Sequence, residues 1–178
     1  LSSLISAAYY AGFLLGTRVT LEALGRVGHI RVYSALAAVL SAAMVAVGLT
    51  GEPAAWMFLR FVTGLCLAGL YVVAESWLNN LATNDNRGRL LAVYLVVSTG
   101  AFGLGQVLLF ALDARTATGY ALAGIAASLA VVPVALSAHA VVPVVRNEAG
   151  LTLRELAREV PTGVGSCLLV GLVHGGLT

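Results

Sequence analysis

The sequence has 178 residues, of which 60% are apolar and only 10% are charged, and its mean hydropathy is +0.95. A soluble domain carries about a quarter charged residues, and a domain of this size has a large surface relative to its core. This composition excludes an ordinary water-soluble enzyme or binding module. The formal net charge of +2 is scattered singly between apolar runs and gives no basis for nucleic-acid binding.

Long apolar stretches follow one another along the chain and predict membrane-spanning helices, since a span needs about 20 mostly apolar residues. They cover 1–17, 32–51, 53–84, 90–112, 116–145 and 160–178. Strands of a membrane barrel are about ten residues long and alternate in polarity, whereas these runs are longer and apolar on every face. We therefore expect an all-α polytopic membrane bundle with five spans and the start of a sixth.

The chain opens at Leu1 inside one apolar run and stops at Thr178 inside another. We expect it to be an excerpt of a longer polypeptide. The first span leads to Arg18 and Glu22, an i, i+4 pair whose charges are expected to neutralise each other.

Arginines near the span ends set the orientation, because cytoplasmic connections carry the excess of basic residues. The first, third and fifth connections hold seven of them, and the second and fourth hold only Arg115. Connections 24–31, 79–89 and 146–160 are therefore predicted to be cytoplasmic. The seven are Arg26, Arg31, Arg87, Arg89, Arg146, Arg154 and Arg158.

The third span carries the two charges that need an explanation, because a charge at the bilayer centre costs at least about 2.5–3.5 kcal/mol. Residues Arg60, Gly64, Ala68, Tyr71 and Glu75 recur at helical spacing and share one face. This stripe predicts a helix that lines a water-filled cavity. The alternatives are that Arg60 snorkels to the headgroups and that Glu75 forms a salt bridge with Arg87 or Arg89.

The fourth span places Gln106 near the glycines Gly100, Gly103 and Gly105. Small residues allow helices to approach closely, so packing explains the glycines. Gln106 either binds substrate or bonds a neighbouring helix. Pro133 predicts a kink in the fifth span.

Five aromatic residues near span ends are assigned to the interfacial belt and not to a ligand site. They are Tyr33, Trp56, Trp77, Tyr94 and Tyr120.

The connection 146–160 differs from the others, because apolar and charged residues alternate in it at helical spacing. Thr152 and Glu155 form a capping-box pattern, which predicts a short amphipathic helix. The domain organisation we expect is an N-terminal bundle over 1–145, a cytoplasmic linker over 146–160, and the start of a C-terminal bundle over 161–178.

The run from Arg60 to Asn79, RFVTGLCLAGLYVVAESWLN, and the run from Asn86 to Tyr94, NRGRLLAVY, resemble the major facilitator superfamily of transporters. The likeness is to its bacterial YcaD-like branch, from the second helix to the start of the seventh. The bundle over 1–145 would then lack the first helix.

The resemblance implies transport of a small solute by alternating access, without covalent chemistry. Arg60, Gly64, Tyr71 and Gln106 would line the cavity, and a charge network would gate it. The network would include Arg18, Glu22, Arg26, Gly28, Arg31, Glu75, Arg87 and Arg89.

Two motifs of the superfamily are altered in this sequence. Gly25 stands where the loop between the second and third helices usually has an acid, and His29 stands where it has a basic residue. Glu22, one turn earlier, is a candidate substitute for the missing acid. The fifth helix of the family reads Gly103-Leu104-Gly105-Gln106 here and lacks the Gly-Pro pair of the antiporter signature.

The main rival class is an intramembrane enzyme, which needs paired acids, a Ser/His pair or a metal cluster on facing helices. Asp85 and Asp113 lie in predicted loops and the histidines are isolated, so we expect no enzyme, cofactor or metal site. A non-transporting sensor or scaffold on the same fold remains the alternative function. The expected partners are the lipid bilayer of the bacterial inner membrane, a small-molecule substrate, a candidate coupling proton and the C-terminal half of the same chain.

Overall fold

The computed structural model describes residues 2–111, 117–136, 158–159, 161–162 and 165–166. The chain divides into two compact units, Leu1–Val144 and Val145–Thr178. Most of the predicted linker and of the predicted sixth span lies outside the described residues. Within the second unit, residues 158–159, 161–162 and 165–166 are helical, and Ser166 Oγ donates a hydrogen bond of 2.7 Å to Thr162 O.

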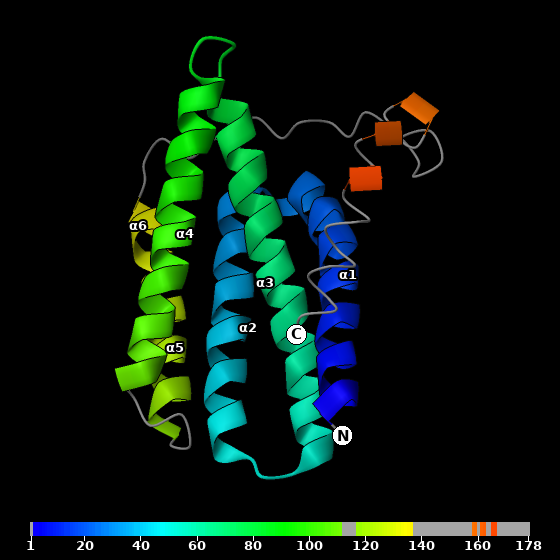
Figure 1. The fold of residues 1–178 in the computed structure, drawn as a ribbon, viewed down its shortest axis with the longest axis vertical. Coiled ribbons are helices and arrows are strands. Elements are labelled where there is room, and N and C mark those ends of the chain that lie inside the picture. The colour runs from blue at the N-terminus through cyan, green and yellow to red at the C-terminus, as the bar shows by residue number, and fades with distance from the viewer. Residues whose placement is uncertain (1, 112–116, 137–157, 160, 163–164, 167–178) are drawn as a thin grey trace. The chain divides into compact units, whose positions relative to one another are not determined.

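The described part of the first unit consists of helices that run side by side (Figure 1). They are α1 (Ser2–Val27), α2 (His29–Leu49), α3 (Pro53–Leu81), α4 (Arg87–Ala111), α5 (Ala117–Leu129) and α6 (Val131–Leu136). Five segments are long and apolar enough to cross a membrane, the last of them formed by α5 and α6 together. The five predicted spans and the all-α membrane fold are confirmed.

The corner between α1 and α2 is tighter than the predicted connection 24–31. Helix α1 continues to Val27 and α2 begins at His29, so Gly28 alone turns the chain. Its φ of +84° lies in a region that only glycine occupies at little cost. The positive φ is the physical reason why a single residue replaces the expected loop.

Helices α1 and α3 form the most extensive contact of the bundle. Three glycines bring the two backbones together: a Cβ on Gly12 would meet the carbonyl oxygen of Phe61, one on Gly16 that of Leu65, and one on Gly64 that of Tyr9. Such small residues at helical spacing let membrane helices approach to backbone contact. This interface fixes the position of α3, which carries the predicted cavity stripe.

Helix α2 packs against both α3 and α5. Near the corner it contributes Val32 to a small apolar core with Leu24 of α1 and Val73 of α3. On its other side, Ser41 Oγ donates a hydrogen bond of 2.8 Å to Gly124 O and lies 2.7 Å from Ser128 Oγ. Hydroxyl groups thus connect α2 to α5, whereas glycines allow the close contact between α1 and α3.

The fifth span breaks where Pro133 predicts a kink. Helix α5 ends at Leu129 and α6 starts at Val131. A proline ring clashes with the carbonyl four residues earlier and removes one helical hydrogen bond, and the residue four positions before Pro133 is Leu129. At the opposite end of this span, the rings of Tyr120 and Trp56 lie 6.4 Å apart between centroids, in edge-on contact.

Helix α4 makes few contacts with the other described helices. No residue in its apolar window is buried, whereas a third of the corresponding window of α3 is buried. Apolar side chains such as Val96 and Phe102 are exposed along it. Within the described part of the chain, α4 is therefore the helix with the least-covered surface.

Candidate functional site

The predicted stripe on α3 divides into two parts in the structure. Gly64 and Ala68, in its middle, are buried, and Gly64 packs on the backbone of α1. Arg60 and Tyr71 are not buried; the Tyr71 side chain is 46% exposed. Glu75 at the end of the stripe is also exposed. The stripe therefore serves both as a packing surface and as a line of accessible polar groups.

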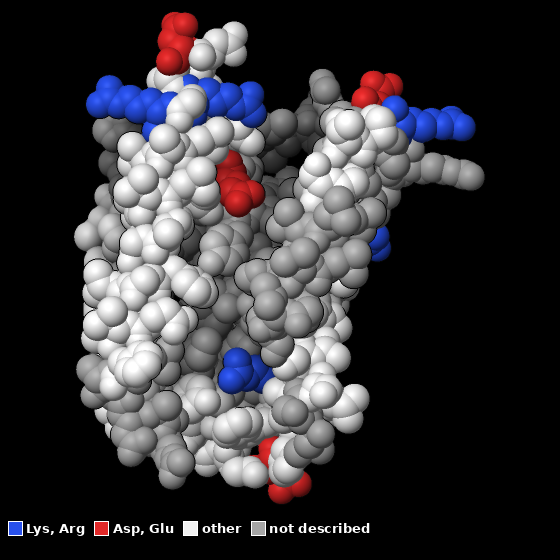
Figure 2. Space-filling view, in the orientation of Figure 1, with Lys and Arg blue, Asp and Glu red and all other residues white. Residues whose placement is uncertain are grey.

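Charged groups of both signs lie on the face of the bundle that Figure 2 shows, in the hollow beside α4 as well as at the helix ends. Arg60 and Glu75 are the two charged residues of α3. They are 15 residues apart, about 22 Å at 1.5 Å per residue. Because of this separation they cannot pair with each other.

Tyrosines from three helices connect the two ends of this line. Tyr9 of α1 interacts electrostatically with Arg60 and Tyr71, and Tyr94 of α4 interacts with Tyr71 and Glu75. A side-chain hydrogen bond also links Tyr94 to Ser98. Tyr71 thus interacts electrostatically with the tyrosines on both α1 and α4. We call Tyr9, Tyr71 and Tyr94 the tyrosine line.

Gln106, the remaining predicted cavity residue, is exposed on α4. No described side chain is hydrogen-bonded to it, and it does not take part in the tyrosine line. A Cβ on Gly100, Gly103 or Gly105 would meet nothing within 4 Å. The close helix approach expected at these glycines is therefore absent among the described helices.

The predicted gating residues gather at the end of the bundle where α1 meets α2 and α3 meets α4. Arg18, Glu22, Arg26 and Arg31 are exposed there, and Gly28 forms the corner. Among the described residues Arg18 and Glu22 do not form the expected ion pair. Among the described residues, these charged side chains form no ion pairs with one another.

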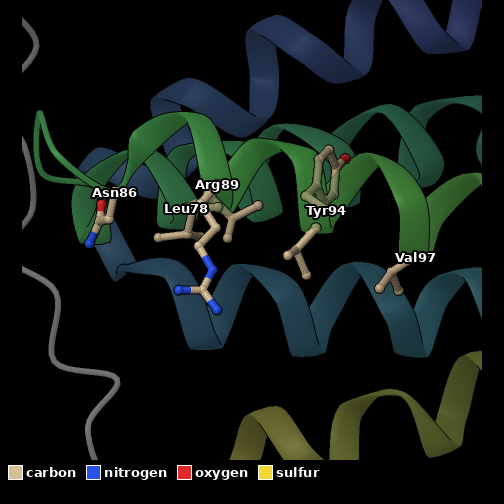
Figure 3. Close-up of a pocket in the computed structure, with 7 residues that line it drawn as sticks. Leu78, Asn86, Arg89, Tyr94 and Val97 are labelled. Carbon is tan, nitrogen blue, oxygen red and sulfur yellow. The ribbon is translucent and has the colours of Figure 1, made fainter.

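The salt bridge considered for Glu75 is not formed with either arginine. Arg87 instead donates a hydrogen bond of 2.9 Å to Asn79 Oδ1. Arg89 lines a groove beside α4, and its guanidinium points toward α2 (Figure 3). Neither arginine in the first turn of α4 is therefore paired with Glu75.

His29 provides a contact that the sequence did not indicate. Its side chain is only 6% exposed, and its Nε2 lies 3.0 Å from Ser76 Oγ of α3. The imidazole also lies beside Trp77, with 6.4 Å between ring centroids. Its Nδ1 has no hydrogen-bond partner among the described residues. The residue at the altered position of the loop thus joins the α1–α2 corner to α3.

The groove beside α4 has a volume of about 380 Å³. Its wall consists of residues at helical spacing on α4, together with the end of α3 and the turn between them (Figure 3). The lining residues are Leu78, Asn86, Arg89, Leu90, Val93, Tyr94 and Val97. Tyr94 belongs both to this groove and to the tyrosine line, so the two features adjoin.

Tyr9 and Tyr94 are the site residues that sequence reasoning missed. Tyr9 lies in an uncharged span, and Tyr94 was assigned to the aromatic belt. One signal was available: Tyr94 follows Arg87 and Arg89 by one to two turns, so it lies inside the span rather than at its end. No local signal distinguishes Tyr9 from the adjacent Tyr10.

Chemically, the described residues offer charges, hydroxyl groups and aromatic faces for reversible binding. No group of three or more His, Cys, Asp or Glu residues that could hold a metal ion occurs in the described ranges. Cys66, the cysteine that the structure describes, is buried. Groups of this kind can hold a solute by reversible contacts.

No family model matches the chain, and no solved structure matches it. Curated bacterial proteins do match. The chain is 32% identical over 180 aligned positions to the "Uncharacterized MFS-type transporter YcaD" of Salmonella newport and to that of Salmonella typhi. The protein of the same name from Salmonella agona is 31% identical. Each alignment covers 98% of this chain and 46% of the relative, so the chain spans about half the length of the curated relatives it matches.

The similarity and the fold agree with each other. Five apolar helices of spanning length make the chain a multi-pass membrane protein, and the relatives that match nearly all of it are MFS-type, YcaD-like proteins. The chain belongs to the major facilitator superfamily, as part of a YcaD-like member.

Proposed function

We propose that the full-length protein is a secondary transporter that moves a small solute across the bacterial inner membrane by alternating access. The observation that carries this proposal is the line of accessible polar groups on α3. Arg60 and Glu75 lie within a span, where a charge is costly, and neither forms an ion pair with another described residue. Polar residues retained at such a cost typically line a substrate or ion pathway.

The domain organisation follows from the same proposal. Residues 1–145 would form most of one bundle without its first helix, 146–160 a cytoplasmic linker, and 161–178 the start of the second bundle. Transporters of this kind bind substrate between two halves that rock about a central site. The curated relatives are about twice as long as this chain, which leaves room for the second half. A proton is the proposed coupling ion.

The proposal is tested by flux. The full-length protein in proteoliposomes is offered a panel of radiolabelled sugars, organic anions and organic cations, with and without an imposed proton gradient. We expect at least one solute to accumulate above the level in protein-free vesicles. Binding of a solute without any accumulation would contradict transport and support the sensor or scaffold alternative.

Substitutions at Arg60 then test the cavity. We expect Arg60→Ala to lower the initial uptake rate by about tenfold or more, which corresponds to the loss of a hydrogen bond to a charged group. Arg60→Lys keeps the positive charge and the ability to reach the headgroups, but it loses the planar guanidinium. If Arg60 lines the cavity, we expect Arg60→Lys to lower the uptake rate only partially. Near-normal uptake by both variants would identify Arg60 as an interfacial anchor.

A further inference from the structure

The carboxylate of Glu75 is the starting point, because it is a charge inside an apolar span. Its side chain is exposed on the face of α3 that also carries Tyr71, one turn earlier. A carboxylate in such a segment needs a cationic partner, a water-filled cavity or a proton. The nearest candidates for a partner within the chain are arginines.

None of the described arginines forms an ion pair with Glu75. Arg87 donates its hydrogen bond to Asn79 Oδ1 at 2.9 Å. The guanidinium of Arg89 points toward α2 (Figure 3). Arg60 is about 22 Å away along the helix. Among the described residues, the negative charge of Glu75 therefore remains available to a ligand.

The surroundings of Glu75 are aromatic and apolar. Tyr71 precedes Glu75 by one turn on α3, and Tyr94 of α4 lines the groove together with Leu78, which follows Glu75 by one turn. An electrostatic interaction also links Tyr94 to Glu75 and to Tyr71. Beyond Tyr94, aliphatic side chains such as Leu90 and Val93 wall the groove, and Asn86 and Arg89 line it at the loop end. Aromatic faces attract cations, and they do so more strongly where the contact is desolvated. Aliphatic walls suit the apolar substituents of an organic ion.

From this arrangement we infer that Glu75, Tyr71 and Tyr94 form a binding site for an organic cation, with Glu75 as its counter-charge and the groove beside α4 accommodating its apolar groups. The inference rests on the proposed transport function and specifies the substrate class. Arg60, next to Tyr9, lies at the opposite end of the line, where its positive charge does not oppose a cation bound at Glu75.

The test is equilibrium binding of tetraphenylphosphonium to the purified full-length protein in detergent. Tetraphenylborate, which has the same shape and the opposite charge, measures adsorption that depends only on hydrophobicity. We expect the wild-type protein to bind the phosphonium more tightly than the borate. Glu75→Gln should weaken phosphonium binding by about tenfold and leave borate binding unchanged or slightly stronger. Tyr94→Leu and Tyr71→Leu should each weaken it about threefold to tenfold by removing an aromatic face.

Two controls keep the test specific. Glu52→Gln removes a carboxylate from the exposed residue that caps the start of α3, outside the site, and should bind as wild type does. Tyr94→Phe keeps the ring and should retain most of the affinity, which separates the aromatic face from the hydroxyl group.

Equal affinity of the wild-type protein for the phosphonium and the borate would overturn the cation site. So would an affinity of Glu75→Gln for the phosphonium within about twofold of the wild-type value. Because binding in detergent does not require flux, the two proposals fail separately. If a sugar or an anion accumulates in proteoliposomes while the phosphonium and the borate bind equally well, transport is supported and the cation site is refuted. Phosphonium binding that depends on Glu75, without flux of any solute, would preserve the site and refute transport.

Discussion

Helices α1 and α4 are both long, apolar and rich in glycine, yet they have opposite surroundings. Along α1, Gly12 and Gly16 press against the backbone of α3, and a Cβ on either would meet a carbonyl oxygen. Along α4, Gly100, Gly103 and Gly105 have nothing within 4 Å. Glycines at similar spacing therefore form an interface on α1, but those on α4 contact none of the described helices.

This difference shows that glycine spacing indicates what a helix is able to do and not what it does. Close packing requires that the facing helix also has small side chains at the level of the contact. Helix α3 meets this requirement, because Gly64 lies opposite Tyr9 and Gly69 lies beside Thr20. Lipid chains are as apolar as the side chains of a helix, so association in a membrane depends on such fitting rather than on hydrophobicity.

The largest expected effect would come from placing a methyl group in the close interface. Gly64→Ala forces the α1 and α3 backbones apart and should lower the free energy of unfolding by about 1–3 kcal/mol, the usual cost of overpacking. Gly103→Ala adds the same methyl group on α4 in open space, and it should change stability by less than about 1 kcal/mol. Unfolding of the full-length protein in mixed micelles with increasing SDS measures both.

Equal losses for the two variants would break the comparison. They would show that α4 is packed as tightly as α1 in the full-length protein, against a segment other than the helices described. A loss for Gly64→Ala alone would confirm that the α1–α3 interface holds the bundle together.

A smaller effect is expected at the α1–α2 corner, where glycine is needed for its backbone and not for its size. A Cβ on Gly28 would meet nothing within 4 Å, but the residue has a φ of +84°. Gly28→Ala should cost about 1–2 kcal/mol, because L-residues avoid this region. Gly25→Ala, in the last turns of α1 and likewise unobstructed, is the matched control and should be neutral or slightly stabilising.

The SDS titration of these two variants distinguishes the cost of an unfavourable backbone conformation from the cost of a steric contact. If Gly28→Ala proved as stable as Gly25→Ala, the one-residue corner would be wrong and a looser connection, as the sequence predicted, would be favoured. If both lost stability equally, the cause would be crowding at this end of the bundle rather than backbone geometry.

The spans could be predicted from the sequence because the length and polarity of a segment are local properties. The boundaries of α3 follow directly, with Pro53 at its first position and the polar turn after Leu81. The corner at Gly28 was assigned too many residues, because a positive φ leaves no mark in the composition. The break before Pro133 was predictable, since the proline acts on its own helix.

The candidate site was predicted less completely, because it depends on which faces of the helices contact one another. The α3 stripe follows from spacing, but Gly64 and Ala68 proved to be buried while Tyr71 and Glu75 are exposed. His29 and Ser76 are 47 residues apart, and nothing in either segment indicates their hydrogen bond. Pairing of Glu75 with an arginine of the loop was a reasonable expectation from proximity in sequence. Asn79 takes one of those arginines instead.

The smallest expected effect concerns the contact between α2 and α5, which is made through a hydroxyl group. Ser41 Oγ donates to Gly124 O at 2.8 Å and lies 2.7 Å from Ser128 Oγ. Polar contacts between membrane helices contribute about 0.6 kcal/mol on average, because the separated helices find other partners. Ser41→Ala should therefore cost about that much in the SDS titration. Ser34→Ala, on the same helix and without a described hydrogen-bond partner, should cost nothing measurable.

The size of the Ser41 effect decides which contact positions the second pair of helices. A loss near 0.6 kcal/mol would mean that α5 is held mainly by packing, such as that of Gly124 against Val45. A loss as large as that of Gly64→Ala would rank the hydroxyl contact with the glycine interface. In that case α2, which contacts both α3 and α5, would carry as much of the stability of the bundle as α1 does.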